Sequence, residues 1–151
     1  MAVTAYIALG SNRGDRPAAL AAALAALPSL GVEVLAVSRV RDTAPVGAAG
    51  RGHFLNAVAQ VETALPPRLL LRRLLALERR LGRHRAGRAR AKTPRTIDLD
   101  LLAYGRLRLR TPDLVLPHPR ARERWFIQAA FSDLLQGKAQ PGAGPPAQPR
   151  P

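Results

Sequence analysis

The sequence contains no cysteine, which excludes a disulfide framework, a zinc site with cysteine ligands and a thiol nucleophile. It also contains no apolar run that approaches the roughly 20 residues of a transmembrane helix. The first residues, Met1–Ile7, hold no basic segment followed by a long apolar stretch, so they do not form a secretory signal peptide. These features predict a cytoplasmic protein that does not bind membranes.

Acidic and aromatic residues are scarce. Asp and Glu number 10 against 24 Lys and Arg, the formal net charge is +14, and aromatic residues make up 4% of the chain. Such a charge favours anionic partners, namely nucleic acids, membrane surfaces or phosphorylated small molecules, although a biased genome composition is an alternative source of arginine. RNA-recognition domains stack bases on aromatic residues of their sheet, and no predicted strand combines aromatic with basic residues. We therefore expect no nucleic-acid partner.

The order of secondary-structure elements can be predicted from hydrophobic periodicity. With 151 residues, 47% of them hydrophobic, the chain is long enough for one domain with a sizeable core. The predicted elements are strand 5–9, helix 15–27 capped by Asp15, strand 32–40, loop 43–52, strand 54–63, helix 66–82 with a leucine stripe, loop 83–93, strand 96–104, ribbon 107–109, turn 117–119 and helix 125–135.

This order, βαββαβ followed by a helix, predicts the α+β class. More specifically, it predicts a ferredoxin-like antiparallel sheet with both main helices on one face plus a C-terminal helix. We expect a monomer with one domain over residues 1–136. Residues 137–151 are rich in Gly, Pro, Ala and Gln and cannot bury apolar surface, so they predict a disordered tail.

The most informative stretch is the nonapeptide Pro94–Leu102, in which two carboxylates alternate with aliphatic residues. On a strand, Asp98 and Asp100 share one face, with Thr96 beside them. Two neighbouring carboxylates repel each other unless a cation or a shared proton lies between them. Magnesium takes carboxylate oxygens and shares its site with substrate phosphates. The alternative is a solvated strand face, but the aliphatic neighbours indicate a buried strand and favour a metal site.

Basic residues lie immediately before this pair. Arg95 adjoins it, and the loop 83–93 is dense in arginine and lysine without a hydrophobic period. Carboxylates beside such a segment suggest a metal–polyphosphate site, with the loop mobile until a polyphosphate binds. The alternative is that the loop is only a solvated surface that attracts polyphosphates. No glycine-rich P-loop motif is present, so side chains must neutralise the phosphates.

Six short motifs, in order, give the chain a family resemblance. They are Tyr6–Asn12, Asp42–Gly47, Phe54–Ala57, Leu81–Arg83, Pro94–Asp100 and Leu116–Pro119. Over about residues 4–135 the chain resembles 6-hydroxymethyl-7,8-dihydropterin pyrophosphokinase, an enzyme of folate biosynthesis. The resemblance implies transfer of pyrophosphate from ATP to the hydroxymethyl group of the pterin, giving AMP and the pterin diphosphate.

The resemblance also implies roles for individual residues. Two Mg²⁺ ions would be held by Asp98 and Asp100, and the catalytic arginines would be Arg83 and Arg95, whose forked guanidinium groups suit phosphate oxygens. The implied ATP-binding residues are Glu78, Arg83, Arg95, His118 and Arg124. The implied pterin-binding residues are Thr43, Ala44, Pro45, Val46, Phe54, Asn56 and Phe126.

Several of these residues have structural alternatives. Asn56 offers a donor and an acceptor to the edge of a pterin ring, but it can equally satisfy a turn or a neighbouring strand. Phe126 can belong to the core, and His118, between two prolines, can cap a turn. Glu78 lies near the end of a long helix, where the ATP-binding role and a structural role are both open.

Overall fold

The computed structural model describes residues 2–43, 53–82, 97–137 and 140–141. Its centre is a sheet with the strand order β5-β1-β4-β2-β8, and β3 pairs with β4 beside this path. A second sheet consists of β6 and β7. The strands are β1 (Val3–Ser11), β2 (Val32–Val37), β3 (Arg41–Thr43), β4 (Phe54–Thr63), β5 (Asp98–Tyr104), β6 (Leu109–Arg110), β7 (Val115–Leu116) and β8 (Gln140–Pro141).

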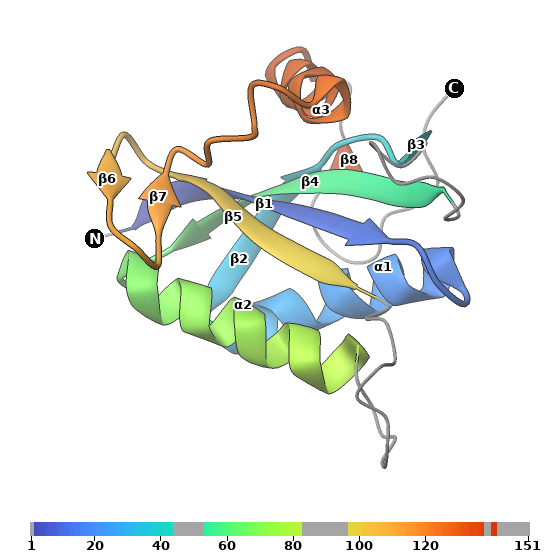
Figure 1. The fold of residues 1–151 in the computed structure, drawn as a ribbon, viewed down its shortest axis with the longest axis horizontal. Coiled ribbons are helices and arrows are strands. Elements are labelled where there is room, and N and C mark those ends of the chain that lie inside the picture. Colours follow the sequence, from blue (N-terminus) through green and yellow to red (C-terminus); the bar gives the residue numbers. More distant parts are fainter. Residues whose placement is uncertain (1, 44–52, 83–96, 138–139, 142–151) are drawn as a thin grey trace.

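The described residues form three α-helices, which lie on two sides of the main sheet (Figure 1). On one side are α1 (Arg16–Ala26), which continues into the 3-10 turn η1 (Leu27–Leu30), and α2 (Pro67–Gly82); on the other is α3 (Trp125–Leu135). β1 pairs antiparallel with β4 and β5, and β4 pairs antiparallel with β2. The predicted α+β class is therefore confirmed.

Local sequence signals explain the first two helices. Asp15 is the N-cap of α1 because its Oδ1 accepts the backbone N–H of Ala18 at 3.1 Å. Pro17 lies in the first turn, where a proline costs no helical hydrogen bond. In α2 the predicted leucine stripe faces the core, where Leu70, Leu74 and Leu77 are buried. Both helices thus follow the periodicity of the sequence.

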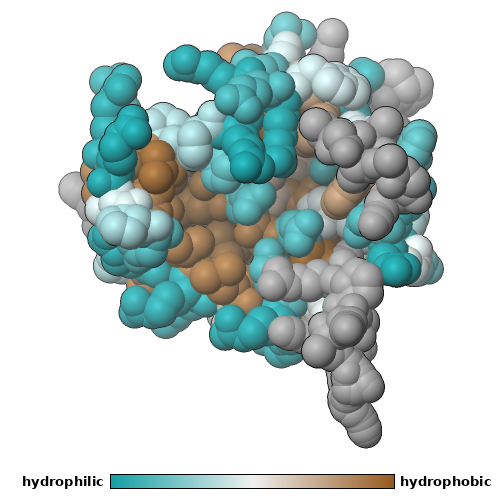
Figure 2. Space-filling model, in the orientation of Figure 1, coloured by the Kyte–Doolittle hydropathy of each residue, from teal (hydrophilic) through white to brown (hydrophobic). Residues whose placement is uncertain are grey.

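The two faces of the main sheet bury different amounts of apolar surface. Leu99 and Leu101 of β5 enter the large core that the sheet shares with α1 and α2. Toward α3 there is a smaller cluster, formed by Leu102, Val58, Ile127 and Ala130. Alternate residues of a strand share a face, so Asp98 and Asp100 lie on the same side as α3. Figure 2 shows apolar side chains gathered on the face of the molecule where β5 and α2 lie in Figure 1.

The structure differs from the predicted elements around Ser38. β2 ends at Val37 rather than Val40, because the Ser38 hydroxyl accepts the N–H of Val58 at 2.9 Å in place of a backbone carbonyl. The chain then bends and forms β3, which pairs with the start of β4. Thr43, predicted as the first residue of the loop 43–52, is therefore the last residue of β3, and residues 44–52 lie outside the described residues.

The C-terminal segment also differs from expectation. Within the predicted disordered tail, Gln140 and Pro141 pair with β2. Residues 138–139 and 142–151 lie outside the described residues, so disorder of the tail stays a prediction there. The predicted ribbon 107–109 is shifted, since β6 begins at Leu109 and pairs with β7. None of the described helices has the length and apolarity needed to cross a membrane.

Candidate active site

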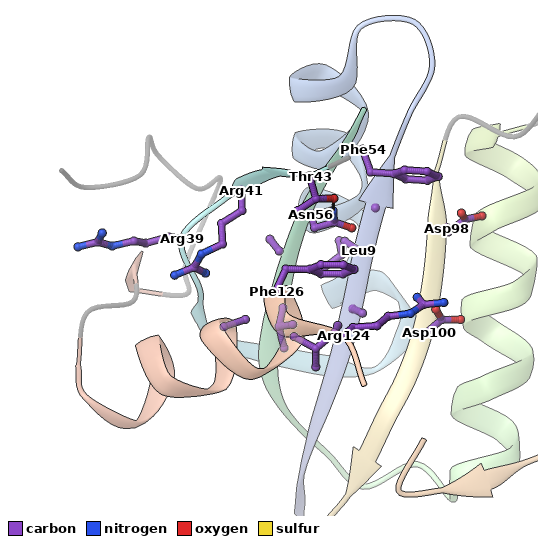
Figure 3. A pocket seen from close by; sticks show the side chains of 16 residues that line it. Leu9, Arg39, Arg41, Thr43, Phe54, Asn56, Asp98, Asp100, Arg124 and Phe126 are labelled. Carbon is purple, nitrogen blue, oxygen red and sulfur yellow. Dashed lines mark hydrogen bonds between the residues drawn. The ribbon is translucent and has the colours of Figure 1, made fainter. Parts of the chain in front are cut away.

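A cavity of about 300 Å³ opens on the α3 side of the main sheet. Its floor is the end of β1 at Ala8 and Gly10, and its walls come from β3, β4, β5 and the start of α3 (Figure 3). The 11 residues of α3 span about 16 Å, whereas the 10 residues of β4 span about 33 Å. The helix therefore covers only part of this face and leaves the cavity beside it.

Asp98 and Asp100 both line this cavity from β5. They lie opposite Gly10 and Ala8 of β1 in the strand register, and these small residues leave the space before the carboxylates open. Among the described residues there is no group of three or more His, Cys, Asp or Glu side chains that could hold a metal. Two adjacent carboxylates fit Mg²⁺ nonetheless, because Mg²⁺ is commonly bound through one or two carboxylates, with water and substrate phosphates completing its shell.

An amide and two aromatic rings line the same cavity. Asn56 Nδ2 donates a hydrogen bond of 2.7 Å to the hydroxyl of the buried Thr43. This contact leaves Asn56 Oδ1 beside Gly10, where an added Cβ would come within 3.0 Å of that oxygen. In Figure 3 the rings of Phe54 and Phe126 lie on either side of Asn56 and extend toward the aspartates. The arrangement suits a flat ring with donors and acceptors along one edge.

Asn56 and Phe126 also make the structural contacts that were the alternatives to a binding role. Asn56 does satisfy a neighbouring strand through Thr43. Phe126 packs against the smaller apolar cluster and also forms a wall of the cavity. Its neighbour Trp125 is 62% exposed, with its ring centre 5.9 Å from that of Phe126 at an angle of 87°. A structural contact and a place in the cavity are therefore compatible for Asn56 and Phe126.

A second cavity, also of about 300 Å³, lies on the other side of Asp100. It is lined by apolar residues of α2, β5 and the β6–β7 hairpin, together with His118 and Asp113. Arg68 joins α2 to this hairpin through hydrogen bonds of 3.3 Å to Asp113 and 3.0 Å to Thr111. Asp100 is the residue that both cavities share. Sequence reasoning missed this hollow, because its wall is built by two-residue strands that carry no periodic signal.

His118 and Arg124 lie at the two cavities. The backbone N–H of His118 donates to Leu102 O at 2.8 Å, which attaches the turn to β5. Its Nδ1 accepts the N–H of Arg120 at 3.1 Å, so the predicted turn cap exists beside the cavity position. Burial lowers the pKa of His118; the charge of Asp100 opposes this shift, and Arg124 and Arg120 reinforce it. The guanidinium of Arg124 reaches the Asp100 end of the first cavity (Figure 3).

The remaining predicted site residues are not part of this cluster. Glu78 is buried on α2, where its Oε2 accepts the N–H of Leu99 at 2.7 Å. It is not among the described residues that line either cavity. The predicted catalytic and pterin-binding residues that lie outside the described residues are Arg83, Arg95, Ala44, Pro45 and Val46.

Two charged residues of the cavity, Arg39 and Arg41, were not predicted from the sequence. Arg41 forms an ion pair with Asp133 of α3, with Nη1–Oδ2 and Nη2–Oδ1 distances of 2.8 and 3.1 Å. The backbone N–H of Arg39 also donates to Asp133, at 3.1 Å. Burial alone would raise the pKa of Asp133, but the hydrogen bonds from Arg41 and Arg39 outweigh it and lower the pKa. The sequence signal that could have indicated these residues is the i, i+2 spacing of Arg39 and Arg41, which places both side chains on one face of an extended chain.

Comparison with known proteins gives consistent matches. The sequence profile of the family described as 7,8-dihydro-6-hydroxymethylpterin-pyrophosphokinase matches residues 6–136. A Bacillus subtilis protein named 2-amino-4-hydroxy-6-hydroxymethyldihydropteridine pyrophosphokinase is 42% identical over 133 residues, 87% of this chain and 78% of that protein. A Methylorubrum extorquens protein of the same name is 42% identical over 133 residues, 86% and 81% of the two chains. The mitochondrial folate synthesis bifunctional protein of Pisum sativum is 38% identical over 85% of this chain and 24% of its own length.

Proposed function

Since the chain belongs to the 7,8-dihydro-6-hydroxymethylpterin-pyrophosphokinase family, we propose that it transfers pyrophosphate from ATP to 6-hydroxymethyl-7,8-dihydropterin in folate biosynthesis. The products are AMP and the pterin diphosphate. The observation that best supports this function is the place of Asp98 and Asp100. They border a cavity with an amide and two aromatic walls, and Asp100 also borders a second, largely apolar hollow.

In this proposal the first cavity binds the pterin. Asn56 presents its Oδ1 toward the ring edge while Thr43 holds the amide by its Nδ2. Phe54 and Phe126 stack on the ring faces, because aromatic rings prefer offset stacking on flat partners. The hydroxymethyl group then points to the aspartates. The loop 44–46 completes the recognition of the ring edge.

The second hollow takes the nucleotide, with the phosphates directed toward Asp100. His118 is neutral at neutral pH, because burial lowers its pKa. With Nδ1 accepting from the backbone, its proton lies on Nε2, which is free to donate to a phosphate or ribose oxygen. Arg124, together with Arg83 and Arg95, neutralises the triphosphate. Such transfers need positioning and charge neutralisation more than covalent chemistry from the protein.

Asp98 and Asp100 would hold two Mg²⁺ ions between the two substrates. When bound, Mg²⁺ stabilises charge on the phosphate oxygens and makes a coordinated hydroxyl a better nucleophile. The walls of the cavities exclude water from the transferred group. The proposed transfer of pyrophosphate requires no general base from the described side chains.

The test is AMP formation from ATP, measured with and without the pterin and with Mg²⁺ or EDTA. AMP should form only when both the pterin and Mg²⁺ are present.

Asp98→Ala and Asp100→Ala should each lower turnover by more than about 100-fold, the loss expected when transition-state charge is no longer stabilised. Glu33→Ala removes an exposed acid of β2 and is the matched control, with turnover unchanged. AMP formation without the pterin, or normal turnover in either aspartate variant, would contradict the proposal.

Further properties are part of the same proposal. The order β5-β1-β4-β2, with α1 and α2 on one side, supports the ferredoxin-like topology expected from the sequence. We also propose that the protein is a monomer, that it is cytoplasmic, and that it binds neither nucleic acids nor membranes. Sedimentation analysis and cell fractionation would test the first two, and binding assays the rest.

A further inference from the structure

Glu78 has a contact that the proposed nucleotide role does not explain. The residue lies on α2 and is only 6% exposed. Its Oε2 accepts the backbone N–H of Leu99 at 2.7 Å. Leu99 lies between Asp98 and Asp100 in β5, so this carboxylate bonds to the backbone at the centre of the aspartate pair. In Figure 3 the α2 helix runs beside β5, on the side of the strand away from β1.

The direction of this bond follows from the sheet. In the described part of the sheet β5 is the last strand, paired on one side with β1. Residues of an antiparallel strand alternate between facing the partner strand and facing away. The Leu99 amide points away from β1 toward Glu78, so the backbones of Asp98 and Asp100 face β1 opposite Gly10 and Ala8. The segment is therefore held from both sides.

We propose that Glu78 is a positioning residue for the metal-binding carboxylates, rather than a ligand of ATP. A strand that shifts by one residue turns all its side chains to the opposite face, and an edge strand is held by fewer ladder bonds than an inner strand. The Glu78 bond fixes this segment so that both carboxylates stay on the cavity face. This inference rests on the metal role proposed for Asp98 and Asp100.

The test compares Glu78→Ala and Glu78→Gln with Leu77→Val as the packing control. Leu77 is the adjacent buried residue of α2, so its truncation loosens the helix but keeps the Glu78 bond. Mn²⁺ binding is measured by electron paramagnetic resonance in the presence of a non-hydrolysable ATP analogue. Glu78→Ala should weaken Mn²⁺ binding by about tenfold or more, the effect typical of lost partners that orient metal ligands. Glu78→Gln, which keeps an oxygen acceptor, should recover most of it, and Leu77→Val should bind normally.

Four results would overturn the inference. One is normal Mn²⁺ binding by Glu78→Ala, and another is an equal loss in Leu77→Val. The third is a loss of analogue binding by Glu78→Ala in EDTA, which would make Glu78 a direct nucleotide ligand. In the unaltered protein, the Leu99 amide should exchange slowly with deuterium despite its edge position; fast exchange would also reject the inference. If Asp100→Ala itself bound Mn²⁺ normally, the proposed metal site would be wrong instead.

Discussion

At the scale of single residues, polar side chains of the two cavities are oriented by neighbouring protein groups. Thr43 holds Asn56, and the lack of a side chain at Gly10 leaves room for the Asn56 amide oxygen. The backbone of Leu102 holds the turn that carries His118. Preorganisation of this kind lowers the cost of fixing polar groups when a ligand binds. The effect of a substitution should therefore depend on which end of the site the residue faces.

Asn56→Ala should weaken pterin binding by about tenfold or more, because the polar edge of the ring would lose its donor and acceptor in a desolvated site. ATP binding should stay nearly unchanged, since Asn56 does not line the second cavity within the described residues. Titration calorimetry with each ligand separately measures both affinities. Thr43→Val is the informative companion, because it keeps Asn56 but removes the hydroxyl that orients it. Equal losses for both ligands in Asn56→Ala would refute the division of the site.

The shared face of the aspartate pair could be predicted from local sequence, whereas the long-range contacts around the pair could not. The shared face of Asp98 and Asp100 depends only on the alternation of a strand, which is local. The contact between Arg41 and Asp133 joins residues 92 positions apart, and no local pattern encodes such a pairing. For Glu78 the sequence showed a helical position but not the strand edge that it meets.

At the scale of elements, α3 is joined to the β2–β3 bend by one carboxylate. Asp133 is 6% exposed and accepts hydrogen bonds from the guanidinium of Arg41 and the N–H of Arg39. The same helix carries Phe126 and begins after Arg124. The positions of Arg124 and Phe126 therefore depend on a contact near the opposite end of the helix.

Asp133→Ala should lower the free energy of unfolding by about 2–3 kcal/mol, because it leaves the Arg41 charge and the Arg39 amide without this acceptor. Chemical denaturation measures the change. Asp133→Asn keeps an oxygen acceptor and should lose less. A change below about 0.5 kcal/mol in the alanine variant would mean that water replaces the carboxylate at no cost.

The same residue predicts a pH dependence. The pKa of Asp133 in the folded protein is lower than the ordinary 3.8, so the ionised carboxylate stabilises the fold fully above that ordinary value. This stabilisation is lost as the pH falls from 3.8 through the lower folded-state pKa. The unfolding free energy of Asp133→Asn should therefore vary less with pH in this acidic range than that of the unaltered protein. Parallel acid titrations of both proteins would contradict the assignment.

Long elements were predicted better than short ones. The helix 125–135 and the leucine stripe of α2 follow from periodicity, and both are confirmed. The strands β3, β6 and β7 have two or three residues each, too few for alternation to be seen. Their pairing depends on the chain around them, such as the Ser38 hydroxyl that replaces a backbone acceptor. The second cavity was missed for this reason.

At the scale of the whole molecule, two cavities of similar size meet at one strand. Asp100 borders both, so a cation that it holds would be in contact with both ligands. Ligands that share a cation bind with a reciprocal coupling free energy. The two sites should consequently behave as one thermodynamic unit only when the cation is present.

We expect the pterin to bind at least about tenfold more tightly with Mg²⁺ and a non-hydrolysable ATP analogue than without them, within the usual range of coupling between sites. In EDTA the analogue should have no such effect, and Asp100→Ala should abolish the coupling. Calorimetric titration of the pterin under each condition gives the comparison. A pterin affinity that is independent of Mg²⁺ and nucleotide would show that the cavities act separately.

The lone tryptophan of the chain contacts Phe126, with the two ring centres 5.9 Å apart, and Phe126 lines the first cavity. Because Trp125 is 62% exposed, its emission should be sensitive to changes around Phe126. A reduced pterin absorbs near-ultraviolet light in the region where tryptophan emits, so a pterin stacked on Phe126 should quench Trp125 by energy transfer. The intrinsic fluorescence of Trp125 should therefore report pterin binding, which can be followed in real time without an added label.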